Sequence, residues 1–523
     1  MGMKVLFVAA EVAPFVSVGG LSQVVYYLPQ ALTKLGHDVR VFTPKYGTID
    51  ASVKEGDKRK KWPLSMEYEG LKVPLEHVSQ GQKERKKENL SYLICNVKSY
   101  RGKKSLPSAY FLENREYYEL RANVFGYNDD HTRFALLSKG VLEWLLKKDK
   151  SWFPDVIHCN DWHSCYLIEL AKRDQRYQKL LSKTPVVLTV HNFFFQGNFD
   201  FRFASADDKD DGANPLEPLL SPKLQKQNAL LRGIRFADAI TTVSPTHAIE
   251  VLTPEYAHGL EEELVKARGK LIGILNGLDT KEFNPAKDPN IKKQYNERTF
   301  ITGRRENKLD LQKTFALEQN EQKTLLAISG RLSQQKGWDL LLEVLPHLLT
   351  HRKDVQMIVV GGGDDIYRNR LVLLQKEYQE QLALHLQADF RLPRKLFAGA
   401  DMILIPSIFE PGGIVALEAL RYGAVPIVRR TGGLNDIIED FNPENRRGNG
   451  FSFTEKDPWA LYGAVIEALT VYRQPVLWQR LVRNAMSDDF SWEHAAADYD
   501  GWYRQVSEQY KRAANIITQP AYE

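Results

Sequence analysis

Residues 407–423 read Ser-Ile-Phe-Glu-Pro-Gly-Gly-Ile-Val-Ala-Leu-Glu-Ala-Leu-Arg-Tyr-Gly, and this stretch decides the fold. It follows a short apolar run, Met402–Ile405, which is typical of a buried strand. Prolines and glycines then separate that run from a segment with helical periodicity. A strand, a turn and a helix place Glu410 on the loop at the carboxyl end of the strand, where open α/β sheets bind their ligands. An ordinary turn whose carboxylate caps the helix is the alternative that this stretch alone leaves open.

The same pattern recurs along the whole chain. Apolar runs of strand length, each followed by a polar or glycine-containing turn, lie at 5–10, 39–43, 156–159, 185–190, 239–243, 270–275, 324–329, 355–360, 402–405 and 425–428. Helical segments separate these runs, and the pattern restarts after residue 279. It therefore predicts two successive doubly wound, Rossmann-like α/β domains whose ligand-binding edges face each other across a cleft. We place the domain boundaries so that residues 1–271 and 272–488 form the two domains and 489–523 a final helical segment.

Bulk composition excludes several classes of protein. The chain has 523 residues with 71 basic and 66 acidic side chains, and this near balance argues against a dedicated nucleic-acid binder. Three cysteines are too few for a disulfide framework and favour a reducing compartment. No apolar run approaches the ~20 residues of a membrane span, and no signal peptide precedes the first strand. We expect a cytoplasmic protein without membrane contact, with a plastid left open; the oligomeric state is not predicted.

Charged segments offer weaker signals. Residues 54–61 and 80–88 are rich in charge, and we expect solvated hairpin loops there rather than a nucleic-acid patch. The sequence Asp208-Lys209-Asp210 has the spacing that chelates a metal–nucleotide pair in some glycosyltransferases. No buried strand precedes this copy, so we interpret it as solvated surface. His158 and His163 lie five residues apart, which is not a zinc spacing, and no metal site is predicted.

The first half of the chain places polar residues at three strand ends. Gly19-Gly20 opens a helix after the first strand, Asp161 follows the strand near 156, and His191 follows the run at 185–190. A lone histidine is usually a structural hydrogen-bonding residue. His191, however, lies at the carboxyl end of a strand beside Asn192, where a functional role is as well supported as a structural one. The final segment carries aromatic residues at roughly helical spacing, which favours a packing helix over a sugar platform.

The second half contains what we interpret as a diphosphate site. Arg331 and Lys336 lie five residues apart on one loop, and Gly432-Gly433 opens a helix whose amides and dipole add positive potential. Surface ion pairing is the alternative for the two cations. Neither a Walker motif nor Gly-x-Gly-x-x-Gly is present, so phosphoryl and hydride transfer lose support. If the diphosphate is a leaving group, Glu410 would bind the hydroxyls of the group that is transferred from it. Glu418 is a second carboxylate eight residues further on.

At this point the sequence resembles the bacterial glycogen synthases and plant starch synthases, which are retaining glycosyltransferases of the GT-B architecture. The resemblance spans nearly the whole chain. It rests on Val18-Gly19-Gly20-Leu21, Asn160-Asp161-Trp162-His163, Thr189-Val190-His191-Asn192 with Gln196-Gly197, Ile274-Leu275-Asn276-Gly277-Leu278-Asp279, Gly330-Arg331-Leu332-Ser333-Gln334-Gln335-Lys336-Gly337, Phe409-Glu410-Pro411, Arg430-Thr431-Gly432-Gly433-Leu434 and Phe490-Ser491-Trp492.

The resemblance implies a donor, an acceptor and a role for each domain. It implies transfer of glucose from ADP-glucose, or another nucleotide-glucose, to the non-reducing 4-hydroxyl of an α-1,4-glucan, with retained configuration and without a metal or other cofactor. The first domain is then the acceptor side, the second binds the nucleotide sugar, and the final helix crosses back onto the first. Catalytic roles fall to the side chain of Asp161 and the backbone carbonyl of His191 on the acceptor side, and to Arg331, Lys336 and Glu410. Donor binding falls to Ser17, Gly19, Gly20, Asn276, Glu418, Thr431, Gly432 and Gly433.

The chain also departs from this family's pattern. Ser17 stands where the family has Lys, Gln23 where it has Asp, and the segment 387–394 lacks the Gly-Tyr expected near the base. Glu418 completes a Glu-x7-Glu spacing that is seen in broader GT-B transferases, where the second Glu binds ribose. Two alternatives therefore stay open. One is a GT-B transferase with another donor or acceptor, and the other is a glucan-binding pseudoenzyme.

Overall fold

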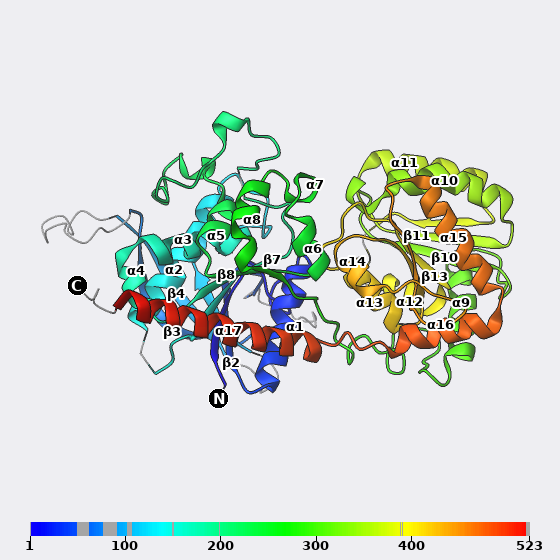
Figure 1. The fold of residues 1–523 in the computed structure, drawn as a ribbon, viewed down its shortest axis with the longest axis horizontal. Coiled ribbons are helices and arrows are strands. Elements are labelled where there is room, and N and C mark those ends of the chain that lie inside the picture. Colours follow the sequence, from blue (N-terminus) through cyan, green and yellow to red (C-terminus); the bar gives the residue numbers. More distant parts are fainter. Residues whose placement is uncertain are drawn as a thin grey trace, which may run out of the picture. The chain divides into compact units, whose positions relative to one another are not determined.

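The protein is built from two compact units, each an α/β domain (Figure 1). The structure, a computed structural model, describes residues 2–49, 62–76, 91–101, 107–148, 151–197, 199–387, 389 and 391–518. Unit 1 comprises Met1–Val243, Ala248–Ile274 and Trp492–Glu523, and unit 2 comprises Ser244–His247 and Leu275–Ser491. The charge-rich segments 54–61 and 80–88 lie outside the described residues.

Unit 1 contains a mostly parallel sheet in the order β3-β4-β5-β2-β1-β6-β7-β8-β9. Its strands are β1 Lys4–Val8, β2 Asp38–Pro44, β3 Ser65–Pro74, β4 Tyr92–Tyr100, β5 Ser108–Glu113, β6 Val156–Asn160, β7 Val186–Val190, β8 Ala239–Thr242 and β9 Leu271–Gly273. Among the described strands of this sheet, β4 alone runs opposite to the others, so its pairings with β3 and β5 are antiparallel. The helices are α1 Gly20–Lys34, α2 Asp130–Lys147, α3 Cys165–Arg173, α4 Gln175–Leu180, α5 Ala229–Phe236, α6 Pro245–Glu250 (which straddles the division between the units), α7 Pro254–Ala257, α8 Glu261–Ala267 and α17 Trp492–Thr518.

Strand β1 shows why both faces of this sheet are covered. Successive side chains of a strand point to opposite faces. Val5 and Phe7 accordingly belong to one hydrophobic cluster, together with α1 and α17, whereas Leu6 and Val8 belong to another, which contains α2, α3 and α5. A strand buried on both faces has no exposed side on which to carry polar side chains, so its polar chemistry lies where it ends.

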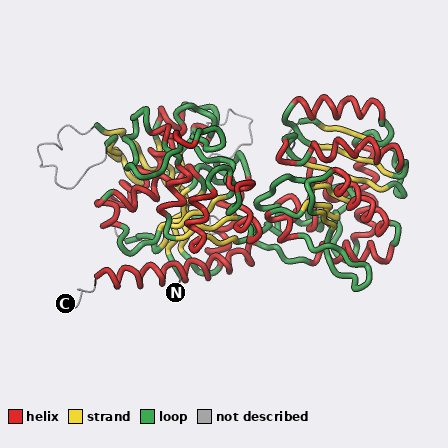
Figure 2. Tube along the Cα trace, turned by 45° about the horizontal axis from the view of Figure 1, so that its top comes forward, coloured by secondary structure: helices red, strands yellow, loops and turns green. Residues whose placement is uncertain are grey.

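Unit 2 contains a fully parallel sheet in the order β12-β11-β10-β13-β14-β15. Its strands are β10 Thr324–Ser329, β11 Val355–Val360, β12 Leu382–His385, β13 Met402–Ile405, β14 Val425–Arg429 and β15 Phe451–Phe453. Its helices are α9 Phe300–Thr314, α10 Trp338–His351, α11 Asp365–Glu377, α12 Leu392–Gly399, α13 Ile414–Arg421, α14 Gly432–Ile437, α15 Pro458–Tyr472 and α16 Pro475–Ser487. Figure 2 shows helices around the strands in each unit.

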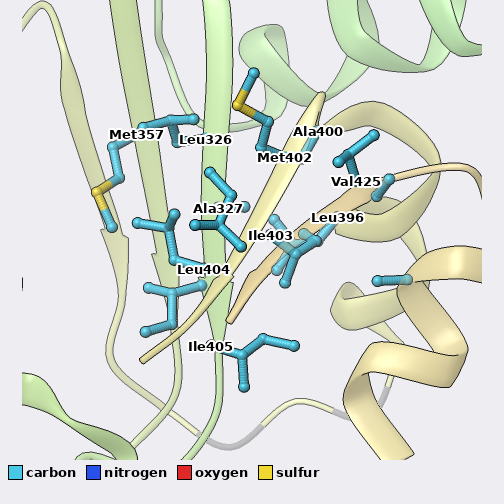
Figure 3. Close-up of a cluster of buried hydrophobic side chains, with 14 of the residues drawn as sticks. Leu326, Ala327, Met357, Leu396, Ala400, Met402, Ile403, Leu404, Ile405 and Val425 are labelled. Carbon is cyan, nitrogen blue, oxygen red and sulfur yellow. The ribbon is translucent and has the colours of Figure 1, made fainter. Parts of the chain in front are cut away.

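The centre of unit 2 is the strand that the sequence stretch 407–423 follows. Figure 3 shows β13 between β10 and β14, with its side chains in one apolar cluster, and Met402 is the residue whose neighbours across the sheet are Leu326 and Val425. All four side chains of β13 are buried. The predicted buried strand at 402–405 is therefore confirmed, and its carboxyl end delivers the loop that carries Glu410.

Helix α17 completes the core of unit 1. Its buried side chains recur at helical spacing and pack in the cluster that contains α1 and β1: Trp492, Ala495, Ala496, Tyr499, Trp502, Tyr503 and Val506. The imidazole of His158 in β6 lies within this packing, with its Nδ1 2.6 Å from the Tyr503 hydroxyl and its Nε2 2.5 Å from Thr189 Oγ1. Burial lowers the pKa of His158 to about 3, so the ring is neutral. The interpretation of this segment as a packing helix is confirmed.

The first prediction concerns this buried contact. Tyr503→Phe leaves a ring nitrogen of His158 without its partner, and an unsatisfied buried polar group costs about 1–3 kcal/mol. We expect the urea midpoint of unit 1 to fall accordingly, as followed by circular dichroism. Tyr510→Phe is the matched control, because its hydroxyl makes only a 3.4 Å contact with the Leu181 carbonyl. Equal losses in the two variants would contradict the prediction.

Candidate active site

The carboxyl ends of β6 and β7 bring Asp161 and His191 together in unit 1. These strands are parallel neighbours, so the residues that follow them lie side by side. Asp161 has a positive φ of 54°, and its Oδ1 accepts a 2.7 Å hydrogen bond from the backbone N–H of His191. The His191 ring in turn lies 3.1 Å from the Asn160 side-chain oxygen through Nε2. Two of the residues predicted for catalysis thus form one hydrogen-bonded group.

Burial sets the protonation of this pair. It raises the pKa of the Asp161 carboxyl to about 7, against the lowering effect of the N–H groups of His191 and Asn192. It also lowers the pKa of His191 to about 4, so the imidazole is neutral at pH 7. The pair therefore combines a neutral histidine with a carboxyl group that exchanges its proton near neutral pH.

A third group, Glu11, lies at the same sheet edge and was missed by the sequence reasoning. It follows β1 and is only 2% exposed. Its Oε2 accepts hydrogen bonds from the backbone N–H groups of Val18, at 2.5 Å, and Gly19, at 3.3 Å. Burial raises its pKa to about 7, the two N–H groups lower it, and the charge of Asp161 raises it further. A carboxylate directly behind an apolar run is the signal that could have identified it.

Glu11 also positions the glycine pair that was predicted to bind the donor. Gly19 is the N-cap of α1 and Gly20 its first residue, and no side chain caps this helix. Ser17 is exposed, and its hydroxyl lies 2.6 Å from that of Ser22, which donates to the Gly19 carbonyl. The turn before α1 is thus held by the Glu11 carboxylate and by the hydroxyls of the exposed Ser17 and the buried Ser22.

In unit 2, Lys336 and Glu410 meet although 74 residues separate them. The Lys336 ammonium lies 2.5 Å from Glu410 Oε2, and the hydroxyl of Ser407 donates to the same oxygen at 2.9 Å. Both groups are half-buried. The loops that carry them are also joined by their backbones, because the N–H of Ile408 donates to the Gln335 carbonyl at 2.8 Å. The loops that carry Lys336 and Glu410 follow β10 and β13, and these strands are neighbours in the sheet. This adjacency brings the two side chains together.

The loop after β14 approaches the Glu410 loop so closely that only glycine fits. A Cβ at Gly433 would lie 2.5 Å from the carbonyl carbon of Gly412, and one at Gly432, whose φ is +44°, would lie 2.3 Å from the Glu410 carbonyl oxygen. The N–H of Gly433 donates to that same oxygen at 3.0 Å. Thr431 is the buried N-cap of α14. Three loops therefore form one cradle at the carboxyl edge of the sheet.

The remaining predicted residues of unit 2 differ in their surroundings. The side chain of Arg331 is exposed, and its carbonyl accepts a hydrogen bond from the Trp338 indole. Glu418 is half-buried on α13, and burial raises its pKa to about 7, opposed by the charge of Arg394. Asn276 is buried, and its Oδ1 has no hydrogen-bond partner within the described part of the chain. The roles of all these residues stay predictions.

The interpretation of Asp208-Lys209-Asp210 as solvated surface is wrong for Asp210. Its carboxylate is almost buried and pairs with Arg232, with 2.7 Å between Oδ2 and Nε. The same oxygen accepts the backbone N–H of Asn228 at 2.9 Å. Arg232 and Glu169 form a further buried pair. Because Arg232 is fully buried, its charge requires carboxylate partners, and the loop supplies one.

Within the described ranges, no cluster of three or more His, Cys, Asp or Glu side chains is arranged to hold a metal ion. In the same residues no helix combines the length and apolar character needed to cross a membrane.

Comparison with known proteins identifies the family to which the chain belongs. The family described as "Starch synthase catalytic domain" matches residues 4–266, and "Glycosyl transferases group 1" matches residues 311–485. A glycogen synthase of Clostridium beijerinckii is 36% identical over 524 residues, which cover 97% of this chain and all of the relative. The chain belongs to the glycogen and starch synthase family. A second member, the glycogen synthase of Lacticaseibacillus casei, is 35% identical over 519 residues, covering 96% of this chain and 99% of that one.

A solved structure of the family supports the fold. The catalytic domain of starch synthase IV from Arabidopsis thaliana, bound to ADP and acarbose, is 29% identical with a TM-score of 0.79, covering 97% of this chain and all of that one. The predicted fold class, two Rossmann-like α/β domains of the GT-B type, is confirmed, as is the resemblance to this family. The chain is therefore a glycosyltransferase of glycogen or starch synthesis. How its two domains face each other stays a prediction.

The second prediction tests the carboxyl of Glu11. In the fold its pKa is about 7 instead of the ordinary 4.5. Between these values the native state holds a proton that the unfolded chain releases, so the free energy of unfolding falls as the pH rises. Glu11→Gln cannot ionise, and we expect its urea midpoint to fall less between pH 5 and pH 8 than that of the wild type. Glu262→Gln, at an exposed carboxylate of unit 1, should retain the wild-type pH dependence. An unchanged slope in Glu11→Gln would contradict the prediction.

Proposed function

We propose that this family member transfers glucose from ADP-glucose to the non-reducing end of an α-1,4-glucan and retains the α configuration. The contact between Lys336 and Glu410 carries the proposal, because it places a cation and a sugar-binding carboxylate in one cradle. ADP and acarbose are bound by the Arabidopsis relative, and the curated relatives are named glycogen synthases. These names support a nucleotide-glucose donor and a glucan acceptor for the present chain.

The cradle of unit 2 suits a nucleoside diphosphate sugar. Lys336 and Arg331 supply positive charge from the loop that follows β10. Both contacts of Glu410 go to Oε2. Within the described residues Oε1 makes no hydrogen bond, so it is available to accept one from a glucose hydroxyl. A diphosphate leaving group gains negative charge as its bond to the sugar breaks, and fixed cations stabilise that state most.

The group at the edge of unit 1 suits the acceptor. The bond between C1 of glucose and the diphosphate oxygen breaks while C1 bonds to the acceptor 4-oxygen, and the proton of that hydroxyl passes to the departing diphosphate oxygen. A buried carboxyl such as that of Asp161, with a pKa near 7, and a neutral His191 provide hydrogen-bonding groups without a permanent opposing charge. The proposal uses no metal ion, since Arg331 and Lys336 can offset the diphosphate charge.

The third prediction concerns the donor. We expect transfer to maltooligosaccharide with both ADP-glucose and UDP-glucose, with the larger kcat/KM for ADP-glucose, and no loss of rate in EDTA. The measurement is release of the nucleoside diphosphate together with growth of the acceptor. Absence of transfer from either donor, with no nucleotide binding by calorimetry, would overturn the proposed function. A strict EDTA sensitivity would overturn the metal-independent part alone.

The fourth prediction concerns Glu410. Glu410→Ala removes both the partner of Lys336 and the carboxylate offered to the sugar, and we expect kcat/KM to fall at least ~100-fold, in line with the loss of a preorganised polar contact. ADP should still bind by calorimetry, because its diphosphate contacts lie on other side chains. Glu444→Ala, at an exposed position of unit 2, is the control and should keep the wild-type rate. Retention of most activity in Glu410→Ala would remove that residue from the mechanism.

A further inference from the structure

A cavity of about 550 Å³ lies at the amino-terminal edge of the sheet of unit 1. Its lining includes the residues at which three strands begin, Lys4 of β1, Asp38 of β2 and Ser108 of β5. Asp161 follows the last residue of β6, which is parallel to β1, so the candidate active site lies at the opposite edge. The five residues of β1 span roughly 16 Å at about 3.3 Å per residue, which separates the cavity from that site.

Positive charge dominates the lining of this cavity. The described residues that line it include two carboxylates, Asp38 and Glu67, and five cations, by which we define the basic cavity: Lys4, Arg40, Arg101, Lys147 and Lys148. The C-terminal end of α2, at Lys147, offsets about half a charge, and Asp155, which accepts the backbone N–H of Lys4 at 2.7 Å, offsets one more. Among these residues positive charge therefore remains in excess, and such a concave cluster of one sign attracts an anion.

Ion pairing within the lining accounts for only part of this charge. Arg40 Nε lies 3.3 Å from Asp38 Oδ1, and Arg101 Nη2 lies 3.1 Å from Glu67 Oε2. The Lys148 ammonium is 3.9 Å from Glu67 Oε1, which is longer than a charge-assisted hydrogen bond. Ordinary surface ion pairing is the alternative interpretation, and it does not explain why five cations gather around two carboxylates.

Aromatic rings hold two of the cations in place. The Arg40 guanidinium lies 4.1 Å from the centroid of the Trp152 ring, and its Nη1 donates to the Tyr110 hydroxyl at 2.5 Å. The Lys148 ammonium lies 4.7 Å from the centroid of the Trp144 ring. The side chains of Arg40 and Lys148 are only 20% and 10% exposed. Their charges are therefore positioned before any ligand arrives, which reduces the ordering cost of binding.

A phosphate ester fits this lining better than other small anions do. A phosphate monoester carries about two negative charges at neutral pH, and a guanidinium can bind two of its oxygens at once. A volume of about 550 Å³ is within the range of small-molecule sites and exceeds what a bare phosphate ion fills. Tyr68, Ser108 and Ser151 also line the cavity, and the Asp38 side chain is 49% exposed, so hydroxyls of a ligand find donors and acceptors there.

We propose that the basic cavity binds a small phosphorylated sugar, with its phosphate held by the lysines and arginines and its hydroxyls by Asp38 and Ser108. This site is distinct from the cradle of unit 2, and it requires no part of the transfer reaction. Because the cavity exists only in the folded chain, a bound sugar phosphate stabilises unit 1.

The fifth prediction tests the cavity with fructose 1,6-bisphosphate as the probe and the full chain without donor or glucan. We expect calorimetry to show binding to the wild type and the melting temperature to rise with probe concentration. In the double variant Arg101→Gln and Lys147→Gln, Kd should rise at least tenfold, since each lost cation removes a charge-assisted contact. Arg101 is 72% exposed and Lys147 is exposed, so the variant should fold as the wild type does and keep its rate of glucose transfer.

Two controls locate the binding. The double variant Lys266→Gln and Arg512→Gln removes the same charge from exposed positions of unit 1, at 65% and 80% exposure, and should bind the probe as the wild type does. Lys336→Ala, in the cradle of unit 2, should also retain binding of the probe while it loses glucose transfer. Binding is measured without transfer, so failure of the proposed function and failure of the cavity site give different results.

Several outcomes would overturn the proposal. One is the absence of fructose 1,6-bisphosphate binding to the wild type at millimolar concentration, and another is an equal loss in the Lys266 and Arg512 variant. Loss of binding in Lys336→Ala, with retention in the Arg101 and Lys147 variant, would assign the probe to the cradle instead. Equal affinity for citrate, or for inorganic phosphate alone, would show a general anion site without recognition of a phosphorylated sugar. Displacement of the probe by a single-stranded oligonucleotide at lower concentration would identify a nucleic-acid surface.

Discussion

The structure depends on one constraint: its central strands are buried on both faces. Val5 and Phe7 pack on one side of β1 and Leu6 and Val8 on the other, and β13 is apolar throughout. Such strands cannot carry charged groups along their length, so ionisable residues collect where the strands end. Neighbouring parallel strands end at the same edge, which brings residues from remote parts of the sequence within hydrogen-bond distance.

The strands and many of the residues at their carboxyl ends could be predicted, because short stretches of the sequence indicate both. Runs of apolar residues give the strands, and a polar residue close behind a run, such as Asp161 or His191, or on the loop that follows it, such as Glu410, must lie at a sheet edge. What could not be predicted depends on contacts between distant segments. The contact between Lys336 and Glu410 follows from strand order, which composition does not encode. Asp210 was misjudged because its partner, Arg232, is buried 22 residues further on.

The two units solve the problem of charge in different ways. In unit 2 the polar groups of the cradle are compensated by pairing, as between Lys336 and Glu410, and glycines let the backbones approach. In unit 1 two carboxyl groups, Glu11 and Asp161, are buried near each other, and burial raises the pKa of both to about 7. One edge thus presents fixed charges suited to an ionic ligand, and the other presents groups whose charge varies near neutral pH, which suits an uncharged, hydroxyl-rich ligand.

The position of α17 has a consequence for how the chain assembles. Its aromatic residues pack with Val5 and Phe7 of β1, and its Tyr503 lies 2.6 Å from His158 of β6, so these strands are covered by a helix that is made after unit 2. The hydrophobic core of unit 2 contains no residue of α17. All residues of unit 2 precede that helix in the chain, so they are synthesised before it. During synthesis, therefore, the face of the N-terminal sheet that α17 covers in the folded protein remains partly exposed until that helix has been made. The core of the first domain is therefore completed only after all of unit 2 has been synthesised.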